Sequence, residues 1–176
     1  NHIWEKSRTL GELSGKTVLI VGAGNIGSEV AKRFSAFDAS VIGVDITDDD
    51  RKYFDKIELL DNLDEQLKIA DIVILTLPLT DSTRGMFDKS KFDLMKKSSI
   101  FVNIARGPLV VESDLINSLK SGDISGAVLD VFEEEPLNEN SPLWDMDNVI
   151  LTPHNSFVGE NNNKRMFDVI VNNLER

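Results

Sequence analysis

The chain of 176 residues is long enough for one domain with a well-buried core, but two domains would be cramped. Its net charge of −11 argues against DNA or RNA as a partner, because nucleic-acid binding depends on Lys and Arg neutralising phosphates. No apolar run approaches the roughly 20 residues of a membrane span. The absence of cysteine excludes disulfides and thiolate metal sites and fits a reducing compartment. We expect a cytoplasmic globular protein with no metal site and no nucleic-acid or membrane partner.

The first predicted unit is a strand, a tight turn and a helix. A β-branched run at residues 18–21 ends at Gly22, and Gly22, Gly24 and Gly27 form a G-x-G-x-x-G pattern. Apolar residues then recur at three- and four-residue steps from position 26 to 37, which predicts a helix. In this context Gly22 permits the turn, Gly24 lets backbone approach a pyrophosphate, and Gly27 lets helix and strand pack closely. The alternative is a plain strand–helix unit without a ligand.

Asp45 strengthens the dinucleotide hypothesis. It lies eighteen positions after Gly27, at the end of a second apolar run at residues 40–44. A carboxylate there can accept hydrogen bonds from both adenosine ribose hydroxyls and repels a 2′-phosphate. The sequence therefore predicts NAD rather than NADP as the cofactor.

Strands and helices alternate along the rest of the chain. Apolar runs predict strands at residues 40–45, 57–60, 71–77, 99–104, 126–131 and 148–151. Helical spacing predicts helices at residues 62–70, 90–95, 112–119 and about 158–176. The alternation is typical of an α/β fold, a doubly wound, mostly parallel sheet of about seven strands with helices on both faces. We interpret residues 1–176 as a single dinucleotide-binding domain.

Polar side chains follow the carboxyl ends of the last three predicted strands. Arg106 follows the fifth strand, Asp130 and Glu135 lie at the end of the sixth, and His154 follows the seventh. Ligands of an open parallel sheet bind outside the carboxyl ends of its strands, near the point where strand order reverses. We therefore expect these four side chains to gather at one rim of the sheet.

His154 is the candidate acid/base. A loop histidine is more often a residue hydrogen-bonded to backbone, but the position at the rim favours catalysis, since an imidazole exchanges protons near neutral pH. A neighbouring carboxylate would favour the imidazolium and fix the ring. Among Glu133, Glu134 and Glu135 we favour Glu135, because Pro136 stiffens its backbone. Spacing alone leaves the other two open.

Arg106 and Asp130 each have two interpretations. Arg106 is either a surface cation or, within Asn-Ile-Ala-Arg-Gly at a strand end, a planar fork for an α-carboxylate or keto oxygen. Asp130 is either a turn or helix-cap carboxylate or an acceptor for a nicotinamide carboxamide. Its position at the end of an apolar strand does not decide between them.

Five blocks of sequence resemble the D-isomer-specific 2-hydroxyacid dehydrogenases, the family that includes phosphoglycerate dehydrogenase. They are GAGNIG, LPLTDSTRGMFD, FVNIARGPLVVESDL, GAVLDVFEEEPL and NVILTPH, in this order and together with Asp45. The resemblance covers residues 13–157. It implies the Rossmann-type NAD-binding domain of an oxidoreductase that acts at C2 of a small 2-hydroxy or 2-keto acid.

The resemblance also implies roles for individual residues. Arg106 would bind and polarise the carboxylate and keto end of the substrate, His154 would be the acid/base, and Glu135 its partner. The backbone amides of Asn25 and Ile26 would contact the pyrophosphate. The other cofactor-binding residues would be Leu77, Pro78 and Thr83 on the adenosine side, and Ile104, Ala105, Arg106, Asp130 and His154 near the nicotinamide.

The resemblance also implies the domain plan of the family, in which a substrate domain made of both chain ends surrounds an inserted cofactor domain. The chain resembles the insert, so we expect residues 1–14 and 160–176 to be connecting segments to an absent substrate domain, and the fragment alone to be inactive. The family implies a homodimer formed through the cofactor domain. Asp38-Ala39 replaces a usual glycine, and residues 155–157 replace small apolar residues near the nicotinamide.

Two alternatives to a dehydrogenase stay open. One is a non-enzymatic NAD sensor, as in the C-terminal-binding-protein corepressors that share these blocks. The other is a cofactor-binding module without turnover. The sequence leaves phosphoglycerate, lactate, glyoxylate, hydroxypyruvate and formate-type substrates open.

Overall fold

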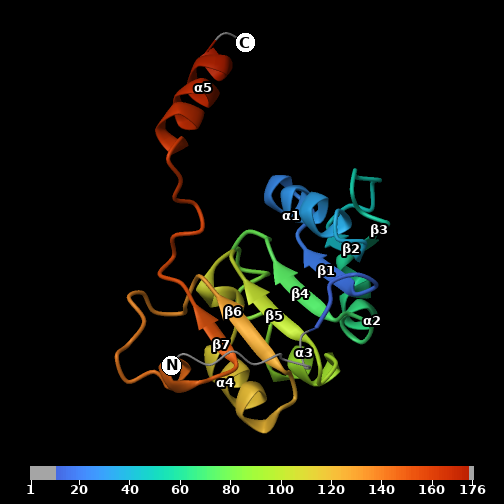
Figure 1. Ribbon diagram of the computed structural model, residues 1–176, viewed down its shortest axis with the longest axis vertical. Helices are drawn as coiled ribbons and strands as arrows, with labels where there is room; N and C mark the ends of the chain where they lie inside the picture. Colours follow the sequence, from blue (N-terminus) through green and yellow to red (C-terminus); the bar gives the residue numbers. More distant parts are fainter. Residues whose placement is uncertain (1–10, 175–176) are drawn as a thin grey trace, which may run out of the picture.

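Seven parallel strands form one sheet in a computed structural model that describes residues 11–174 (Figure 1). The strands are β1 (Thr17–Val21), β2 (Ser40–Asp45), β3 (Lys56–Leu59), β4 (Ile72–Leu75), β5 (Ile100–Asn103), β6 (Gly126–Leu129) and β7 (Val149–Leu151). Their order is β3-β2-β1-β4-β5-β6-β7, and every neighbouring pair is parallel. The order reverses between β1 and β4, which is where an open sheet of this kind binds its ligands. The predicted seven-stranded, doubly wound fold is confirmed.

Residues 11–174 also contain five helices and three short 3₁₀ turns. The helices are α1 (Asn25–Ser35), α2 (Leu63–Leu67), α3 (Lys89–Leu94), α4 (Glu112–Ser121) and α5 (Asn162–Leu174), and the turns are η1 (Leu60–Asn62), η2 (Gly107–Leu109) and η3 (Pro142–Asp145). Gly122 ends α4 with a left-handed φ of 73°. The predicted helix 62–70 is shorter and enters through η1, and the side chain of Asn62 binds Glu58 rather than capping α2.

Side chains of β1 alternate between two apolar clusters, one on each face of the sheet. Val18 and Ile20 pack in a cluster that includes Ala31 of α1, whereas Leu19 and Val21 pack in a larger cluster with α2, α3 and α4. Because both faces are covered, the central strands are apolar along their whole length. The predicted layers, with helices on both faces, are therefore present.

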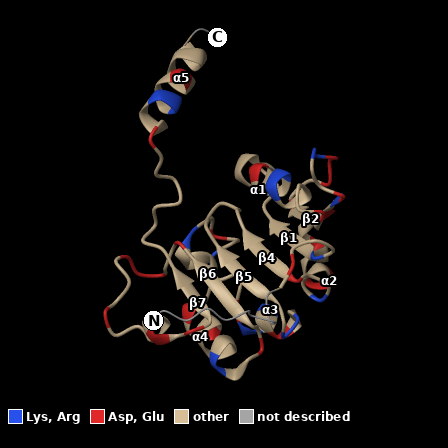
Figure 2. Ribbon diagram, in the orientation of Figure 1, with Lys and Arg blue, Asp and Glu red and all other residues tan. Residues whose placement is uncertain are grey.

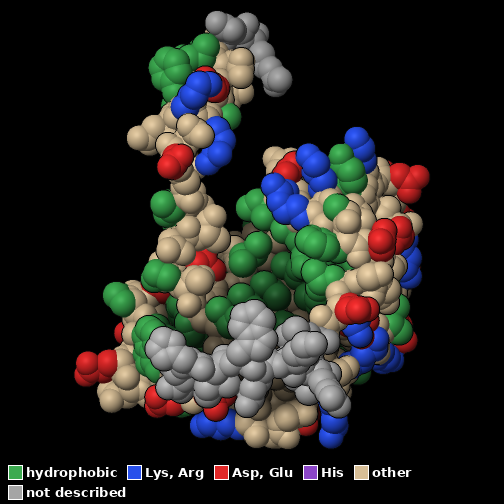
Figure 3. All heavy atoms as spheres, in the orientation of Figure 1, with side chains coloured by type: hydrophobic (Ala, Val, Ile, Leu, Met, Phe, Trp, Pro, Cys, Tyr) green, Lys and Arg blue, Asp and Glu red, His purple; other side chains and the backbone are tan. Residues whose placement is uncertain are grey.

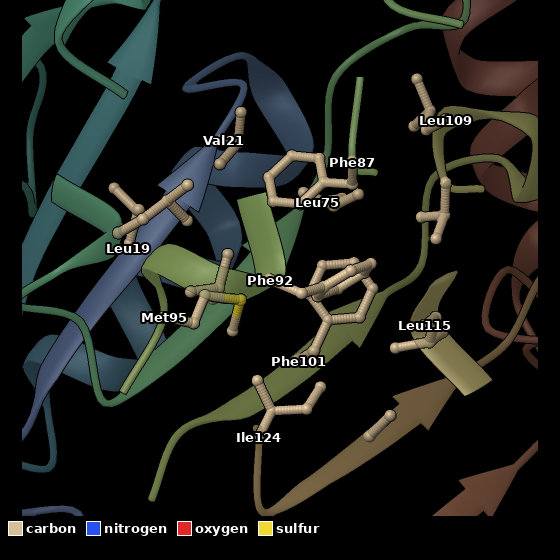
Figure 4. Close-up of a cluster of buried hydrophobic side chains, with 14 of the residues drawn as sticks. Leu19, Val21, Leu75, Phe87, Phe92, Met95, Phe101, Leu109, Leu115 and Ile124 are labelled. Carbon is tan, nitrogen blue, oxygen red and sulfur yellow. The ribbon is translucent and has the colours of Figure 1, made fainter. Parts of the chain in front are cut away.

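Three phenylalanines form the centre of the larger cluster (Figure 4). The ring of Phe101, on β5, lies 5.4 Å from Phe87 and 5.3 Å from Phe92, measured between centroids. All three are fully buried. The cluster fixes β5 beneath α3, and β5 leads into the loop that carries Arg106.

α5 stands away from the sheet at the end of an extended segment that follows β7 (Figure 1). The helix predicted at about residues 158–176 is present as α5, but none of its residues is buried. Met166, Phe167 and Ile170 are all exposed, and Figure 3 shows hydrophobic side chains on its surface. The expected role of residues 160–176 as a connecting segment stays a prediction, and residues 1–10 of the other expected segment lie outside the described part of the chain.

Candidate functional site

The turn between β1 and α1 is held tightly against the end of β4. Gly22 has a left-handed φ of 98°, and a Cβ atom there would lie 2.6 Å from the backbone nitrogen of Leu77. A Cβ at Gly27 would lie 2.2 Å from the carbonyl oxygen of Gly22, and the hydroxyl of Thr76 donates to that same oxygen at 2.6 Å. Glycine is therefore required at both positions for this turn to form.

The N-terminus of α1 is built to receive an anion. Gly24 is the N-cap residue, no side chain caps the helix, and its first turn contains no acidic residue. The first N–H groups of a helix, here including Asn25 and Ile26, have no partner within the helix and carry the positive end of its dipole. A Cβ at Gly24 would meet nothing within 4 Å. This open, uncapped helix end fits a pyrophosphate.

Asp45 lies beside this turn at the end of β2. Its Oδ2 accepts from the backbone N–H of Ala23 at 2.8 Å, and its Oδ1 accepts from Ile46 at 2.7 Å. The guanidinium of Arg51 lies 2.7 Å from Oδ2. Burial acts to raise the pKa of Asp45, but hydrogen bonds from Ile46, Arg51 and Ala23 outweigh it and hold the pKa below its ordinary value.

Leu77, Pro78 and Thr83 lie in one loop that follows β4. Leu77 is buried against Gly22, whereas Pro78 is exposed. The hydroxyl of Thr83 donates to the carbonyl of Pro78 and accepts from the N–H of Thr80, each at 2.8 Å. These bonds fix the loop beside the glycine turn.

Asn103 shapes the loop that carries Arg106. It is 1% exposed, its Oδ1 accepts from Ala105 N–H at 3.1 Å, and its Nδ2 donates to the carbonyl of Arg106 at 3.0 Å. Ala105 is buried and the Arg106 side chain is exposed, with Nη1 donating to the carbonyl of Ala105 at 2.5 Å. Ile104, between Asn103 and Ala105 in the chain, is half-buried. The fork of Arg106 is thus presented at the end of β5.

The Arg106 loop touches the loop that carries Glu135. A Cβ at Gly107 would lie 1.7 Å from the carbonyl oxygen of Phe132, so the two backbones meet where no side chain fits. The N–H of Phe132 donates to Oε1 of Glu135 at 3.0 Å. Gly107 and Phe132 therefore connect the base of Arg106 to the carboxylate of Glu135.

Glu135 and His154 form a direct pair. Oε2 of Glu135 lies 2.7 Å from Nδ1 of His154, while Oε1 is held by Phe132. Burial acts to raise the pKa of Glu135, but the hydrogen bonds from His154 and Phe132 outweigh it, and the pKa lies below its ordinary value. The carboxylate is therefore charged at neutral pH. With Nδ1 engaged, Nε2 is the imidazole atom left for another partner.

Asp130 anchors the loop on which His154 lies. It is 2% exposed and accepts from the hydroxyl of Thr152 at 2.5 Å and from the N–H groups of Asn155 and Ser156 at 3.0 and 3.1 Å. Burial acts to raise its pKa, but these hydrogen bonds outweigh it and lower the pKa. His154 itself has a left-handed φ of 49°, so its backbone needs such support. In the structure Asp130 acts as a turn carboxylate. Its contact with a nicotinamide stays a prediction.

A cavity of about 620 Å³ opens beside the Glu135–His154 pair. Its walls are mainly apolar and include Leu137, Trp144 and Leu151. The remaining lining residues are Phe132, Glu135, Pro136, Thr152, Pro153 and His154. The pair itself stays open to water, since the side chains of His154 and Glu135 are 38% and 35% exposed.

The structure thus brings most of the predicted residues to one rim in two groups. The glycine turn, Asp45 and the Leu77–Thr83 loop lie around the ends of β1, β2 and β4, whereas Arg106, Asp130, Glu135 and His154 lie around those of β5, β6 and β7. Sequence reasoning missed Asn103 and Arg51. Asn103 could have been found as the polar residue that ends an apolar strand. No local pattern indicates that Arg51 pairs with Asp45.

Within residues 11–174, no helix is long and apolar enough to cross a membrane. The same described residues contain no group of three or more His, Asp or Glu side chains arranged to hold a metal ion.

Comparison with known proteins identifies relatives of the whole chain. The family described as D-isomer specific 2-hydroxyacid dehydrogenase, NAD binding domain, matches residues 1–156. D-3-phosphoglycerate dehydrogenase of Methanocaldococcus jannaschii is 40% identical over 98% of the chain and 33% of its own length. Glyoxylate reductase of Thermofilum pendens is 41% identical over 93% of the chain and 48% of its own length.

A solved structure supports the same relationship. The D-isomer specific 2-hydroxyacid dehydrogenase of Xanthobacter autotrophicus Py2, in complex with NADPH and MES, superposes with a TM-score of 0.88 at 34% identity, covering 98% of this chain and 70% of that one. The chain spans about a third to a half of the length of the curated relatives named above. It belongs to the D-isomer specific 2-hydroxyacid dehydrogenase family, of which it matches the NAD(P)-binding domain.

Proposed function

We propose that the chain is the cofactor-binding part of an oxidoreductase that transfers a hydride between NAD(H) and C2 of a 2-hydroxy or 2-keto acid. The observation that carries this proposal is the 2.7 Å contact between Glu135 Oε2 and His154 Nδ1. It orients a ring whose Nε2 can exchange a proton with a substrate hydroxyl. The corepressors share the blocks that contain this pair, so turnover on a 2-keto acid is what separates the two functions.

The residues fit the cofactor along the rim. The open N-terminus of α1 suits the pyrophosphate, and the charged carboxylate of Asp45 suits the hydroxyls of the adenosine ribose. These features support NAD as the cofactor. When bound, the nicotinamide accepts or supplies the hydride.

His154 and Arg106 would divide the remaining work. During oxidation, Nε2 of His154 takes the hydroxyl proton, and during reduction the imidazolium returns a proton to the forming alkoxide. Glu135 holds the ring in place through its contact with Nδ1. Arg106 binds the acid group with its planar fork and offsets charge on the C2 oxygen.

Ile104, Ala105 and Asp130 would lie near the nicotinamide. Arg106 and His154 are separated by one strand, and neighbouring strands lie about 4.8 Å apart, so their strand ends are about 10 Å apart. Two exposed side chains at this separation can reach one small acid from both sides. The acid would therefore bind between them, at the end of β6.

The other parts of the enzyme lie beyond this chain in our proposal. Because the chain spans only about a third to a half of these relatives, we propose that a substrate domain completes the site and selects the acid. The relatives named phosphoglycerate dehydrogenase and glyoxylate reductase leave that acid open. The homodimer and the cytoplasmic location stay predictions.

The test uses the protein in which this chain is joined to its substrate-binding segments. His154→Ala should lower kcat by about 10²–10⁴-fold, the range of general acid–base catalysis, while the affinity for NADH stays near normal. Unchanged turnover would remove His154 from the mechanism. Normal NADH binding without activity of the unmodified protein on any 2-keto acid would favour the sensor.

A further inference from the structure

The carboxylate proposed to receive the adenosine ribose already holds a cation. Nη1 of Arg51 lies 2.7 Å from Oδ2 of Asp45 and also donates to the carbonyl of Ala23. Its Nη2 donates to the hydroxyl of Thr47 at 3.1 Å. The Arg51 side chain is only 26% exposed, so these contacts hold the guanidinium over the carboxylate rather than free in water.

The hydrogen bonds to Asp45 leave little room for a ribose. An ionised carboxylate offers about four acceptor positions. Ala23 N–H and Arg51 occupy two on Oδ2, and Ile46 N–H occupies one on Oδ1. The two vicinal hydroxyls of a ribose need two acceptor positions, so they cannot both bind Asp45 while Arg51 stays in place.

The charge of Arg51 changes which cofactor this site accepts. A bare Asp45 would repel a 2′-phosphate, which is the usual basis of preference for NAD. Here the guanidinium offsets that charge and presents planar N–H donors that match phosphate oxygens. Asp48, Asp49 and Asp50 precede Arg51 but are exposed, so water and salt screen them. Figure 2 shows acidic and basic residues in the loop that follows β2.

We propose that Arg51 makes the adenosine site tolerant of a 2′-phosphate, so that the chain binds NADP as well as NAD. This inference rests on the proposed function, since it concerns the same ribose site. With NAD, Arg51 moves off Asp45 and the ribose hydroxyls take its place. With NADP, Arg51 pairs with the 2′-phosphate and shields it from the carboxylate.

The test is calorimetric titration of the chain with NAD and NADP, and with ADP and adenosine 2′,5′-bisphosphate as shorter probes. We expect the two dinucleotides to bind the unmodified chain within about tenfold of each other. Arg51→Gln removes a charge-assisted contact with phosphate and should raise the NADP-to-NAD ratio of Kd values by about 10- to 100-fold. Arg51→Lys keeps the charge and should fall between.

Lys52→Gln is the matched control, because it removes one positive charge from the same loop and Lys52 lies over the ring of Tyr53. It should leave the ratio of Kd values unchanged. A preference of the unmodified chain for NAD above about 100-fold, or a shift in Arg51→Gln no larger than in Lys52→Gln, would overturn the role of Arg51. Failure of both dinucleotides to bind the unmodified chain would overturn the proposed function itself.

Discussion

Asp130→Asn is the substitution that most sharply tests how the rim is held together. The buried carboxylate accepts three hydrogen bonds, from the Thr152 hydroxyl and from the N–H groups of Asn155 and Ser156. An amide of the same size keeps one acceptor oxygen but presents an NH₂ group to donors on its other side. At least one of the two N–H groups then loses its acceptor.

The magnitude follows from the number and kind of these bonds. A hydrogen bond to a charged group contributes about 1.5–3 kcal/mol, and one between neutral groups about 0.5–1.5. Replacing three of the first kind by two of the second corresponds to a loss of about 1.5–8 kcal/mol. Because Asn155 and Ser156 are exposed and water can replace a lost acceptor, we expect the lower part of this range, a fall in the free energy of unfolding of about 2–4 kcal/mol. For a domain of this size that corresponds to a fall in Tm of about 5–15 °C.

Urea unfolding followed by far-UV circular dichroism measures this loss. Because the folded pKa of Asp130 is lowered, its contribution is complete above the unfolded pKa of about 3.9 and is lost as pH falls through the folded pKa. The difference between the two proteins should therefore be constant from neutral pH to about pH 5 and shrink in stronger acid. Asp81→Asn, at an exposed loop position, is the control and should change stability by less than about 0.5 kcal/mol. Equal stability of Asp130→Asn and Asp81→Asn would refute the anchoring role.

Two further substitutions test the contacts behind the site. Phe101→Ala empties the centre of the buried aromatic cluster and should lower the free energy of unfolding in urea by about 3–5 kcal/mol. Ile100→Ala, at a neighbouring position that is 39% exposed, should lower it clearly less. Equal losses would contradict the packing. Gly107→Ala places a Cβ against the carbonyl of Phe132 and should destabilise the fold by about 1–3 kcal/mol or more. Gly11→Ala, whose Cβ would meet nothing within 4 Å, should not. An unchanged stability of Gly107→Ala would mean that the Arg106 loop and the Glu135 loop do not touch.

Much of the fold could be predicted because its signals are local. The glycine pattern indicated a strand before it and a helix after it. The continuous apolar runs indicated strands that are buried on both faces. Asp38 adopts a left-handed φ of 58°, which explains why a glycine is usual before the second strand. Strand ends were predicted too long, because side chains remain apolar after the chain has left the sheet, as at Leu77.

The site was harder because its contacts join residues far apart in the chain. Pro136 favours Glu135 among three consecutive glutamates, but spacing leaves the other two open, and the tertiary contact with His154 decides between them. Asn103 donates to the carbonyl of Arg106, three residues later, and Arg51 pairs with Asp45 across a loop. Hydrophobic periodicity indicates neither contact. Electrostatic pairing of this kind depends on the placed backbone, not on spacing.

In the proposed enzyme, one dinucleotide spans the rim from the α1 N-terminus to His154. Titration of the ¹⁵N-labelled chain with NADH, followed by NMR, tests it directly, because only two histidines are present and the imidazole of His154 can be assigned by substitution. We expect the amide signals of Gly24, Asn25 and Ile26 and the ring signals of His154 to shift together with one Kd. Shifts at only one of these two places, or at neither, would contradict it.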